Sequence, residues 1–365
     1  MKKYIIIAAV AVAVCCQILI SSSPVAACTG ICIKPKDGAV IHARTLEFAF
    51  DFSSNVIVIP KNMKFVGTAP GNKPGLSWKT KYGMVGVNAF DKPVIVDGLN
   101  EKGLAVGIFY MPGYAKYQEI DAQDVSHTIS PWELPLYLLS GCASVKEAVA
   151  AAQDIKVGEV IEPNLGFAPP VHFIVHDAGG KCVVLEYVNG ELKVHDDPIG
   201  VITNSPTFDW HITNLCNYIN LTVTNVPPID ISGIKFSGLG QGTGMLGLPG
   251  DFTPPSRFIR AVVFSQSALP VETAQEGVLQ AFHILNQFDI PKGAARESDH
   301  GKVTADYTLW TSASDLKNLR FYFHTFENRQ IRMIDLKKMD LNAKDLKTFS
   351  MGQKEDIDDL SNAGK

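Results

Sequence analysis

Short stretches rich in apolar residues recur along most of the chain, and turn residues separate many of them. This pattern predicts β-strands. Lys36-Asp37-Gly38 separates the first two stretches, and glycine can adopt the positive φ of a tight hairpin turn. We therefore expect strands over Thr29–Lys34, Ala39–Arg44, Val56–Pro60, Val94–Asp97, Leu104–Tyr110, Val171–Asp177, Cys182–Val188, Glu191–His195, Thr304–Thr311, Leu319–Thr325 and Gln330–Leu336.

Helical signals fall in two blocks between these strands. Pro131 suits the first turn of a helix that continues to Leu139. Ser144-Val-Lys-Glu147 has the pattern of a capping box before an alanine-rich helix that ends near Asp154. A further helix is expected over Val271–Phe288.

The order of these elements indicates the fold class. Strands cluster at the start, middle and end of the chain, and there is no βαβ alternation and no repeat, which favours an α+β fold with sheets covered by helices. No linker rich in Pro or Ser interrupts the chain after residue 27. We therefore expect one domain over residues 28–350 and a polar tail over residues 351–365.

The first 27 residues have the pattern of a secretory signal peptide. Two lysines precede an apolar run over Tyr4–Ile20, and the small residues Val25 and Ala27 stand at the −3 and −1 positions of a cut before Cys28. The alternative is a membrane anchor, but the run is at the short limit for a membrane span. We expect an exported protein, periplasmic or secreted, without stable membrane insertion once the signal is removed.

Composition narrows the possible partners. The chain is 46% hydrophobic and 19% charged, which is typical of a globular protein. Its formal net charge of −4 becomes −6 when Lys2 and Lys3 leave with the signal, and no basic stripe is present, so nucleic acid is not an expected partner. Five cysteines remain after residue 27, and an odd number leaves at least one thiol unpaired in an exported monomer.

Other candidate motifs are weak. Cys28-x3-Cys32 has no second pair or histidine cluster to complete a zinc site, so we expect no metal and no organic cofactor. Gly238–Gly250 lacks the Gly-Lys-Ser/Thr ending of a phosphate-binding loop, and we interpret it as a tightly turned loop near the substrate. His176, His195 and His324 lie on strand-like stretches and are expected to be packed or surface residues.

Cys28 allows three interpretations: a lipid attachment point, a structural cysteine, or a nucleophile freed by cutting the chain before it. Val25-Ala-Ala-Cys28 resembles a lipobox, but a lipoprotein usually continues with a polar tether, whereas a strand-like stretch begins here at once. An N-terminal cysteine carries its thiol beside its own α-amine. The amine has an ordinary pKa near 7.7–8.0 and the thiol one of about 8.5, so the amine can take the thiol proton near neutral pH.

Several long motifs resemble the choloylglycine hydrolase family, which contains penicillin V acylases and conjugated bile salt hydrolases within the N-terminal nucleophile hydrolases. The similarity extends over nearly all of the chain after residue 27. It is carried by CTG at Cys28, ARTLEF over Ala43–Phe48, DGLNEKGL over Asp97–Leu104, TNSPTFDWH over Thr203–His211 and GLPGDFTPPSRFIR over Gly247–Arg260. The resemblance implies a four-layer αββα fold with two stacked, mainly antiparallel sheets.

The resemblance also implies roles for individual residues. Cys28 resembles the nucleophile, Arg44 the arginine beside the thiol, Asn204 a residue that helps to hold the oxyanion, and Arg257 the second active-site arginine. Tyr110 resembles a substrate-binding residue, because penicillin V acylases often carry Tyr where bile salt hydrolases usually carry Asn.

Glu47 departs from the family pattern. The family commonly has Asp at this position, where the carboxylate bonds the α-amine of the cysteine. Glu keeps the charge but adds a methylene, and a displacement of about an ångström can cost around a hundredfold in rate.

Together these features predict an exported cysteine amidase that hydrolyses a linear, non-peptide amide through a Cys28 thioester. Tyr110, Leu165–Phe173 and Ile290–Gly293 favour a small-molecule substrate like penicillin V. A conjugated bile acid is the alternative, followed by an acyl-homoserine lactone. The rival from another class is a lipid-anchored protein that binds a ligand without turnover. The family resemblance suggests a homotetramer.

Overall fold

The computed structural model describes residues 27–362, except residues 300, 353 and 356. The predicted signal peptide lies outside the described residues apart from Ala27, as does part of the predicted polar tail. In the described part of the chain, no helix is both long and apolar enough to cross a bilayer.

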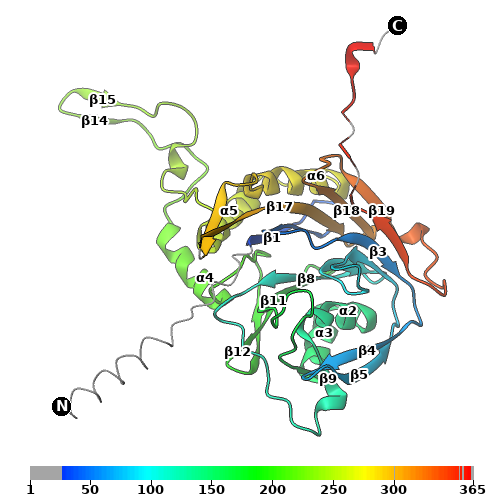
Figure 1. Ribbon diagram of the computed structural model, residues 1–365. Helices are drawn as coiled ribbons and strands as arrows, with labels where there is room; N and C mark the ends of the chain where they lie inside the picture. Colours follow the sequence, from blue (N-terminus) through cyan, green and yellow to red (C-terminus); the bar gives the residue numbers. More distant parts are fainter. Residues whose placement is uncertain (1–26, 300, 353, 356, 363–365) are drawn as a thin grey trace, which may run out of the picture.

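Two antiparallel sheets are stacked on each other between two layers of helices (Figure 1). The first sheet has the strand order β1-β2-β17-β18-β19, and β16 pairs with β17. Its strands are β1 (Ala27–Ile33), β2 (Ile41–Phe48), β16 (Ala295–Asp299), β17 (Lys302–Asp315), β18 (Arg320–Thr325) and β19 (Arg332–Asp335).

The second sheet has the order β13-β12-β11-β8-β7-β6-β3-β20. All neighbouring strands in it are antiparallel. The strands are β3 (Asn55–Ile59), β6 (Met84–Val87), β7 (Asp97–Asn100), β8 (Leu104–Tyr110), β11 (Val171–Asp177), β12 (Cys182–Val188), β13 (Glu191–Asp196) and β20 (Lys347–Ser350).

Helices cover the outer face of each sheet, which completes the four layers. Helices α5 (Pro254–Ser267) and α6 (Ala274–Leu285) pack on β1, β2 and β17, whereas α2 (Leu134–Gly141) and α3 (Val145–Gln153) pack on β7, β8 and β11. Both the α+β class and the αββα layering predicted from the sequence are therefore confirmed.

Close approach of the two sheets depends on Gly30 in β1. A Cβ at this position would lie 2.7 Å from the Phe109 ring of the second sheet and 2.8 Å from Ile202. Gly30 also forms an isolated antiparallel bridge with Ile202, which ties β1 to the chain segment after β13. The start of β1 therefore lies in the buried centre of the molecule, where the first sheet packs against the second.

Most predicted elements are present, with shifted ends. The helix expected from Pro131 begins as the 3-10 turn Pro131–Glu133 and continues as α2, and the helix expected over Val271–Phe288 is α6 followed by the turn Asn286–Phe288. Gly38 has a φ of +80°, as its predicted turn requires. The strand expected over Val94–Asp97 is wrong, since β7 begins only at Asp97, where pairing with both β6 and β8 starts.

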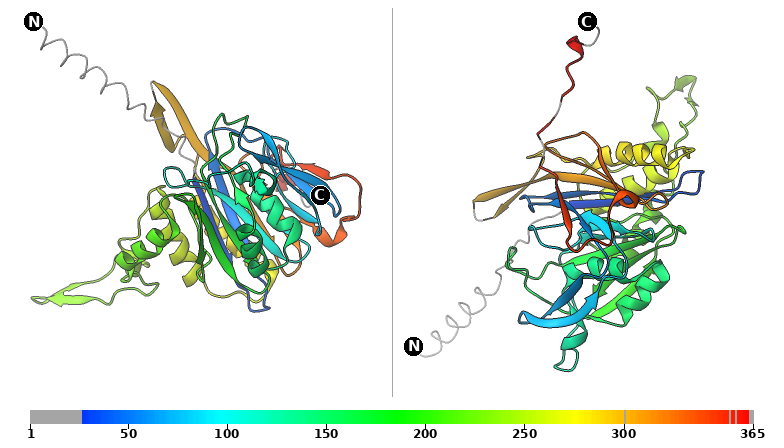
Figure 2. Two further views of the ribbon diagram at one scale, coloured as in Figure 1. Left: turned by 90° about the horizontal axis from the view of Figure 1, so that it is seen from below. Right: turned by 90° about the vertical axis from the view of Figure 1, so that its right-hand side faces the viewer.

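The sequence patterns did not identify every element. The missed ones are β4 (Lys64–Ala69), β5 (Lys73–Lys79), β6, α4 (Phe208–Leu215) and α5. Short strands were also missed: β9 (Thr128–Ile129), β10 (Lys156–Val157), β14 (Ile229–Ile231), β15 (Ile234–Phe236), β16 and β20. The β14–β15 hairpin projects far from the body of the molecule (Figure 2).

Candidate active site

Strand pairing brings Cys28 and Arg44 onto one face of the first sheet. In the antiparallel register, Cys28 lies opposite Leu46, Gly30 opposite Arg44, and Ala27 opposite Glu47. Because alternate residues of a strand share a face, Cys28 and Arg44 point toward the second sheet, whereas Thr29 and Glu47 point toward the helical layer. The candidate groups therefore reach the start of β1 from both sides.

Arg257 and Asn204 enclose the backbone of Cys28. Arg257, in the first turns of α5, donates to the carbonyl oxygen of Cys28 and, over 2.9 Å, to the Oγ1 of Thr29. Its Nη2 donates over 2.5 Å to the Oδ1 of Asn204. The same Oδ1 accepts the backbone N–H of Cys28 over 2.8 Å, and the Nδ2 of Asn204 donates to the carbonyl of Tyr110 over 2.8 Å.

The backbone nitrogen of Cys28 stands where a free α-amine would lie. In the chain described, this nitrogen belongs to the peptide bond with Ala27, and it stands in for the amine that a cut would create. Asn204 and Arg257 bind it and the adjacent carbonyl directly. A cut before Cys28 would therefore free an amine whose hydrogen-bond partner is already in place.

Arg44 is a fully buried cation beside the thiol. Its Nε donates to the Thr45 carbonyl over 3.1 Å, and its Nη1 donates to the carbonyl of Ile108 in β8. The guanidinium carbon lies 4.2 Å from the centre of the Phe109 ring. Stacking on an aromatic face and bonding to carbonyls hold the charge in place without a carboxylate within ion-pair distance among the described residues.

The ionisation of Cys28 reflects a balance between burial and charge. Burial raises the pKa of the Cys28 thiol, Arg44 and then Arg257 oppose this, and Glu47 adds to it. The net pKa is raised, so the thiol keeps its proton in the uncut chain. A neighbouring base is therefore needed before this sulfur can act as a nucleophile.

Glu47 is completely buried on the side of the helical layer. Its Oε1 accepts a hydrogen bond from the Oγ1 of Thr308 over 3.0 Å, whereas its Oε2 has no partner among the described residues. Burial raises the pKa of Glu47 to about 7, although Arg257 opposes the shift. With Ala27 attached, the nitrogen of Cys28 bonds Asn204 and not Glu47, so the predicted contact between Glu47 and the amine stays a prediction for the cut chain.

An apolar cavity of about 100 Å³ opens beside the thiol. Tyr110 lines it together with Cys28, and Phe48, Phe52 and Phe90 contribute an aromatic wall. The side chain of Lys92, paired with Glu162, also lines this cavity. The cavity is smaller than the roughly 300–1,000 Å³ typical of pockets for drug-sized ligands, so it suits one small apolar group.

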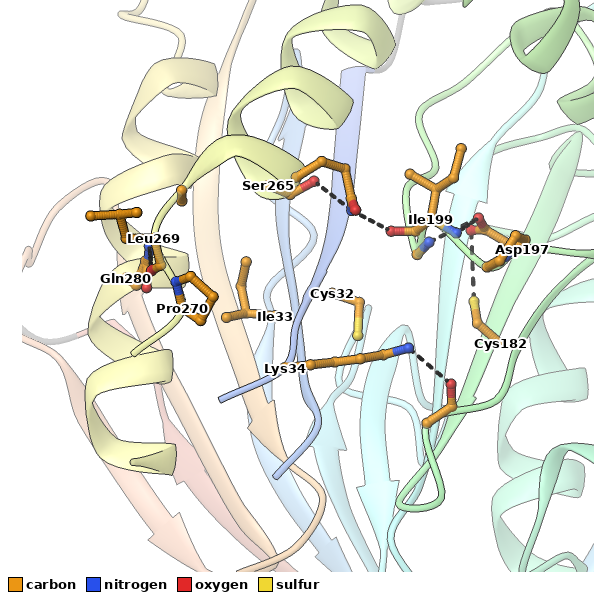
Figure 3. Close-up of a pocket in the computed structure, with 15 residues that line it drawn as sticks. Cys32, Ile33, Lys34, Cys182, Asp197, Ile199, Ser265, Leu269, Pro270 and Gln280 are labelled. Carbon is orange, nitrogen blue, oxygen red and sulfur yellow. Dashed lines mark hydrogen bonds between the residues drawn. The ribbon is translucent and has the colours of Figure 1, made fainter. Parts of the chain in front are cut away.

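A second, larger cavity of about 250 Å³ lies at the other end of β1. Cys32 of β1 and Lys34, which follows that strand directly, line one side, and Cys182 and Asp197 line the opposite side. Lys34 extends across to the carbonyl of Gly180 (Figure 3). Neither Cys28 nor any of the other predicted site residues lines it. The chemistry of the candidate site therefore belongs to the smaller cavity.

Comparison with known proteins identifies the family. A family model described as linear amide C-N hydrolases, choloylglycine hydrolase family, matches residues 28–349. The chain belongs to this family. It is therefore a hydrolase of carbon–nitrogen bonds in linear amides, as the sequence predicted, and it has the N-terminal nucleophile hydrolase fold.

Relatives come from both branches of the choloylglycine hydrolase family. The chain is 35% identical over 325 residues to the bile salt hydrolase/transferase of Clostridium perfringens, covering 88% of this chain and 96% of that relative. It is 28% identical to the penicillin V acylase of Pectobacterium atrosepticum, covering 82% and 77% of the two chains.

Solved structures similar to this chain also include a bile acid hydrolase and a penicillin V acylase. A variant of the conjugated bile acid hydrolase from Clostridium perfringens superimposes with a TM-score of 0.81 at 32% identity, covering 91% of this chain and all of the other. The penicillin V acylase from Agrobacterium tumefaciens has a TM-score of 0.72 at 24% identity, covering 89% and 92%. At that identity the second likeness supports the fold only.

The structure of this choloylglycine hydrolase family member brings together all six residues named from the sequence. Cys28, Arg44, Glu47, Tyr110, Asn204 and Arg257 surround the start of β1. The glycine-rich stretch Gly238–Gly250 does not line the Cys28 cavity, which corrects the expectation that it lies near the substrate. It lies next to the projecting hairpin because β14 and β15 occupy the chain immediately before it.

Sequence reasoning missed several residues that contact the site. Thr29 accepts a hydrogen bond from Arg257, and Thr308 donates one to Glu47. His172 and His211 lie within hydrogen-bond distance of the backbone carbonyls of Thr203 and Asn204. Thr29 could have been found from its place next to Cys28. His211 is seven residues from Asn204 and could have been found from its place in the TNSPTFDWH motif. Thr308 and His172 are distant in sequence from the residues that they contact, so no local signal marked them.

The remaining predictions on histidines and cysteines can be compared with the structure. His176 and His324 are buried on β11 and β18, and His195 is partly buried on β13. All five described cysteines are free thiols. Among the described residues, no group of three or more potential ligands is arranged to hold a metal ion.

Proposed function

We propose that this protein is an exported amidase in which Cys28 becomes the N-terminal nucleophile after removal of residues 1–27. The observation that carries the proposal is the bond of the Cys28 nitrogen to the Oδ1 of Asn204, beside a thiol flanked by Arg44 and Arg257. A freed amine at this place would supply the base that the buried thiol lacks. Charged groups would favour the resulting thiolate.

The chemistry follows from the positions of these groups. The α-amine takes the thiol proton, and the sulfur attacks the amide carbonyl to form a tetrahedral intermediate. One N–H of Asn204 Nδ2 bonds Tyr110, so its second N–H and the backbone N–H of Tyr110 beside the sulfur are candidate donors to the oxyanion. The protonated amine then passes its proton to the leaving nitrogen as the C–N bond breaks.

Water completes the cycle. The departing amine leaves an acyl thioester on Cys28, and the α-amine, again neutral, takes a proton from the attacking water. Collapse of the second tetrahedral intermediate breaks the C–S bond, releases the carboxylic acid and returns the proton to the thiol. No redox partner or further reactant is required.

The acyl group is proposed to be small and aromatic, as in penicillin V. The cavity of about 100 Å³ with its aromatic wall and Tyr110 suits a single ring better than a four-ring steroid. A conjugated bile acid is the second candidate, favoured by the 35% identity to a bile salt hydrolase/transferase. Acyl-homoserine lactones, with a flexible chain, are a third possibility.

Two measurements test the proposal. Intact mass of the protein recovered after export should correspond to a chain that begins with unmodified Cys28. A diacylglycerol adduct would instead support the lipid-anchored binding protein and exclude this mechanism. Initial rates on penicillin V, glycine- and taurine-conjugated bile acids and an acyl-homoserine lactone should then differ strongly in favour of penicillin V. No turnover of any of them would refute the proposed amidase.

We also propose a homotetramer in which the projecting segment takes part in subunit contacts. Its support is an exposed apolar set that a monomer would leave in water. The set consists of Ile219, Val223, Val226, Ile229, Ile231, Ile234, Phe236, Leu239 and Leu246. Light scattering on purified protein should give four chain masses, and Ile231→Lys with Ile234→Lys should lower that number. A monomer in the unmutated protein would contradict the proposal.

A further inference from the structure

The loop that carries Asn204 is held by buried polar groups that the reaction itself does not use. It joins the bridge at Ile202 to the start of α4 at Phe208. The Oγ of Ser205 donates to the Pro112 carbonyl over 2.6 Å, and the Oγ1 of Thr203 donates to the Pro254 carbonyl over 3.1 Å. The position of the Asn204 side chain therefore depends on how firmly this loop is fixed.

Glu186, on β12, contacts both ends of this loop. Its Oε1 accepts the backbone N–H of Phe208 over 2.9 Å. The same oxygen lies 3.0 Å from the Nδ1 of His172, and the Nε2 of His172 lies 3.1 Å from the carbonyl oxygen of Thr203. Glu186 thus bonds the end of the loop directly and its beginning through one imidazole.

The carboxylate is buried and charged. Glu186 is completely buried, and burial by itself raises its pKa, but hydrogen bonds from His172 and then His195 outweigh burial and lower the pKa to about 2. The Nε2 of His195 lies 3.3 Å from the Oε2 of Glu186. The charges of Glu186 and His172 also act on His211, and those of Asp209 and Lys193 act on His195.

Hydrogen-bond chemistry then determines the role of His172. A carboxylate and a peptide carbonyl only accept hydrogen bonds, and a neutral imidazole has a single N–H. To bond both Glu186 and Thr203, His172 must donate from both ring nitrogens, which makes it an imidazolium paired with Glu186. The pair is a charge-assisted bridge, and such bonds are roughly twice as strong as neutral ones.

We propose that Glu186 and His172 are positioning residues for the reaction. They fix the Thr203–Phe208 loop so that the Oδ1 of Asn204 meets the nitrogen of Cys28 and its Nδ2 faces the oxyanion. This inference rests on the proposed amidase function. Neither residue lines the Cys28 cavity, so their effect is on catalysis and not on binding of the acyl group.

His195 provides a matched control. It contacts the same carboxylate as His172, but its side chain is partly exposed on β13 and it has no hydrogen bond to the Asn204 loop among the described residues. A purely structural role of the Glu186 charge would make both histidines matter alike. A positioning role requires His172 to matter far more.

Steady-state kinetics on the best substrate test the proposal. Glu186→Gln keeps the shape but removes the negative charge that favours a doubly protonated His172, and should lower kcat by about 10- to 100-fold while KM stays within about twofold. His172→Gln should behave alike, and His195→Gln should stay within about threefold of the unmutated enzyme. Equal losses in His172→Gln and His195→Gln, or a raised KM with unchanged kcat, would overturn the proposal.

Two further measurements keep the test decisive. Glu186→Asp retains the charge, so it should recover part of the lost kcat, and no recovery in a folded protein would count against the charged bridge. Nitrogen NMR of labelled imidazoles should show both ring nitrogens of His172 protonated at pH 7.5, and one of them unprotonated in Glu186→Gln. A neutral His172 in the unmutated protein would refute the Glu186–His172 ion pair, even if no substrate were turned over. An imidazolium at His172 without turnover would refute only the proposed amidase.

Discussion

Two thiols on the same strand and the same face are both buried, but they have different charged neighbours. Cys28 and Cys32 are four residues apart on β1, and both are less than one tenth exposed. Cys28 is surrounded by Arg44, Arg257 and Asn204, whereas Cys32 has only Lys34 to favour its thiolate and Asp197 to oppose it. Burial raises the pKa of Cys32 to about 12.

The comparison shows that neither burial nor cavity size distinguishes the proposed nucleophile from the other thiol. Cys32 lines the larger cavity and Cys28 the smaller one. What distinguishes Cys28 is a set of fixed charges together with a backbone nitrogen that one cut would turn into a base. A buried thiol without these neighbours behaves as a small apolar side chain.

The strongest test of this comparison is removal of each sulfur in turn. Cys28→Ala should abolish turnover, because no other group can form the thioester, while Cys32→Ala should keep at least about half of the activity. Both variants should unfold within a few degrees of the unmutated protein in a thermal melt. Turnover by Cys28→Ala would end the assignment of the nucleophile.

The second test removes a positive charge next to the proposed nucleophile Cys28. Arg257→Gln loses the bonds to the Cys28 carbonyl and Thr29. Without them Cys28 should shift from its reactive position, and kcat/KM should fall by about a hundredfold. Arg260→Gln, on the same helix, removes bonds to the carbonyls of Pro249 and Asp251 and the contact with the Phe288 ring, and should lose less than about fivefold. Similar losses of kcat/KM in the two variants would show that activity depends on the packing of α5 and not on the charge of Arg257.

A third test concerns Glu47 and pH. Its pKa is raised from 4.5 to about 7 in the folded, uncut chain, so the folded state binds the proton more tightly than the unfolded state. The stability contributed by this tighter proton binding is complete below pH 4.5 and is lost as pH rises through 7, at a cost on the order of 3 kcal/mol. Urea unfolding of a chain that begins at Ala27 should show the decline, and Glu47→Gln should remove it.

The matched control for Glu47 is a chain that begins at Cys28. There a protonated α-amine near the carboxylate favours its charged form, so the stability lost between pH 4.5 and 7 should be smaller. Equal pH dependence in the two chains would mean that Glu47 does not sense the amine, contrary to the role that the family resemblance implies.

The smallest effect is expected at the other end of β1. Lys34→Met removes the cation that spans the larger cavity, and turnover should remain within about twofold. Native-state alkylation followed by peptide mass spectrometry should modify Cys28 well before Cys32 in both proteins. Faster labelling of Cys32 than of Cys28 would reverse the comparison between the two thiols.

Local patterns predicted the mostly apolar strands that are buried on both faces, such as β8, β11 and β12. They missed α5, whose first residues are two prolines and which buries Arg257 and Arg260 along with its apolar side chains. The identity of Cys28, Asn204 and Arg257 came from long motifs, not from periodicity. Their hydrogen bonds join parts of the chain 53 to 229 residues apart, which no local pattern encodes.

Glu186 and His172 are also residues whose contacts could not be predicted from the local sequence. Each lies on a strand that was predicted correctly, within a mostly apolar stretch. A single polar residue in such a stretch gives no sign of whether it faces solvent or another charge. Only the packing of β11 against β12 and of the Asn204 loop across them makes the pair visible.

The short turn between β1 and β2 sets a constraint on how this protein can change in length. All of β1 from Ala27 to Ile33 is paired with β2, and Asp37 in the turn also accepts the N–H of Ala274 at the start of α6. Adding or deleting one residue here would slip the pairing by one and exchange the two faces of β2, so that Arg44 and Glu47 would trade sides. In evolution and in engineering, insertions should accumulate in the projecting β14–β15 hairpin. The number of residues in the turn over residues 34–40 should not change.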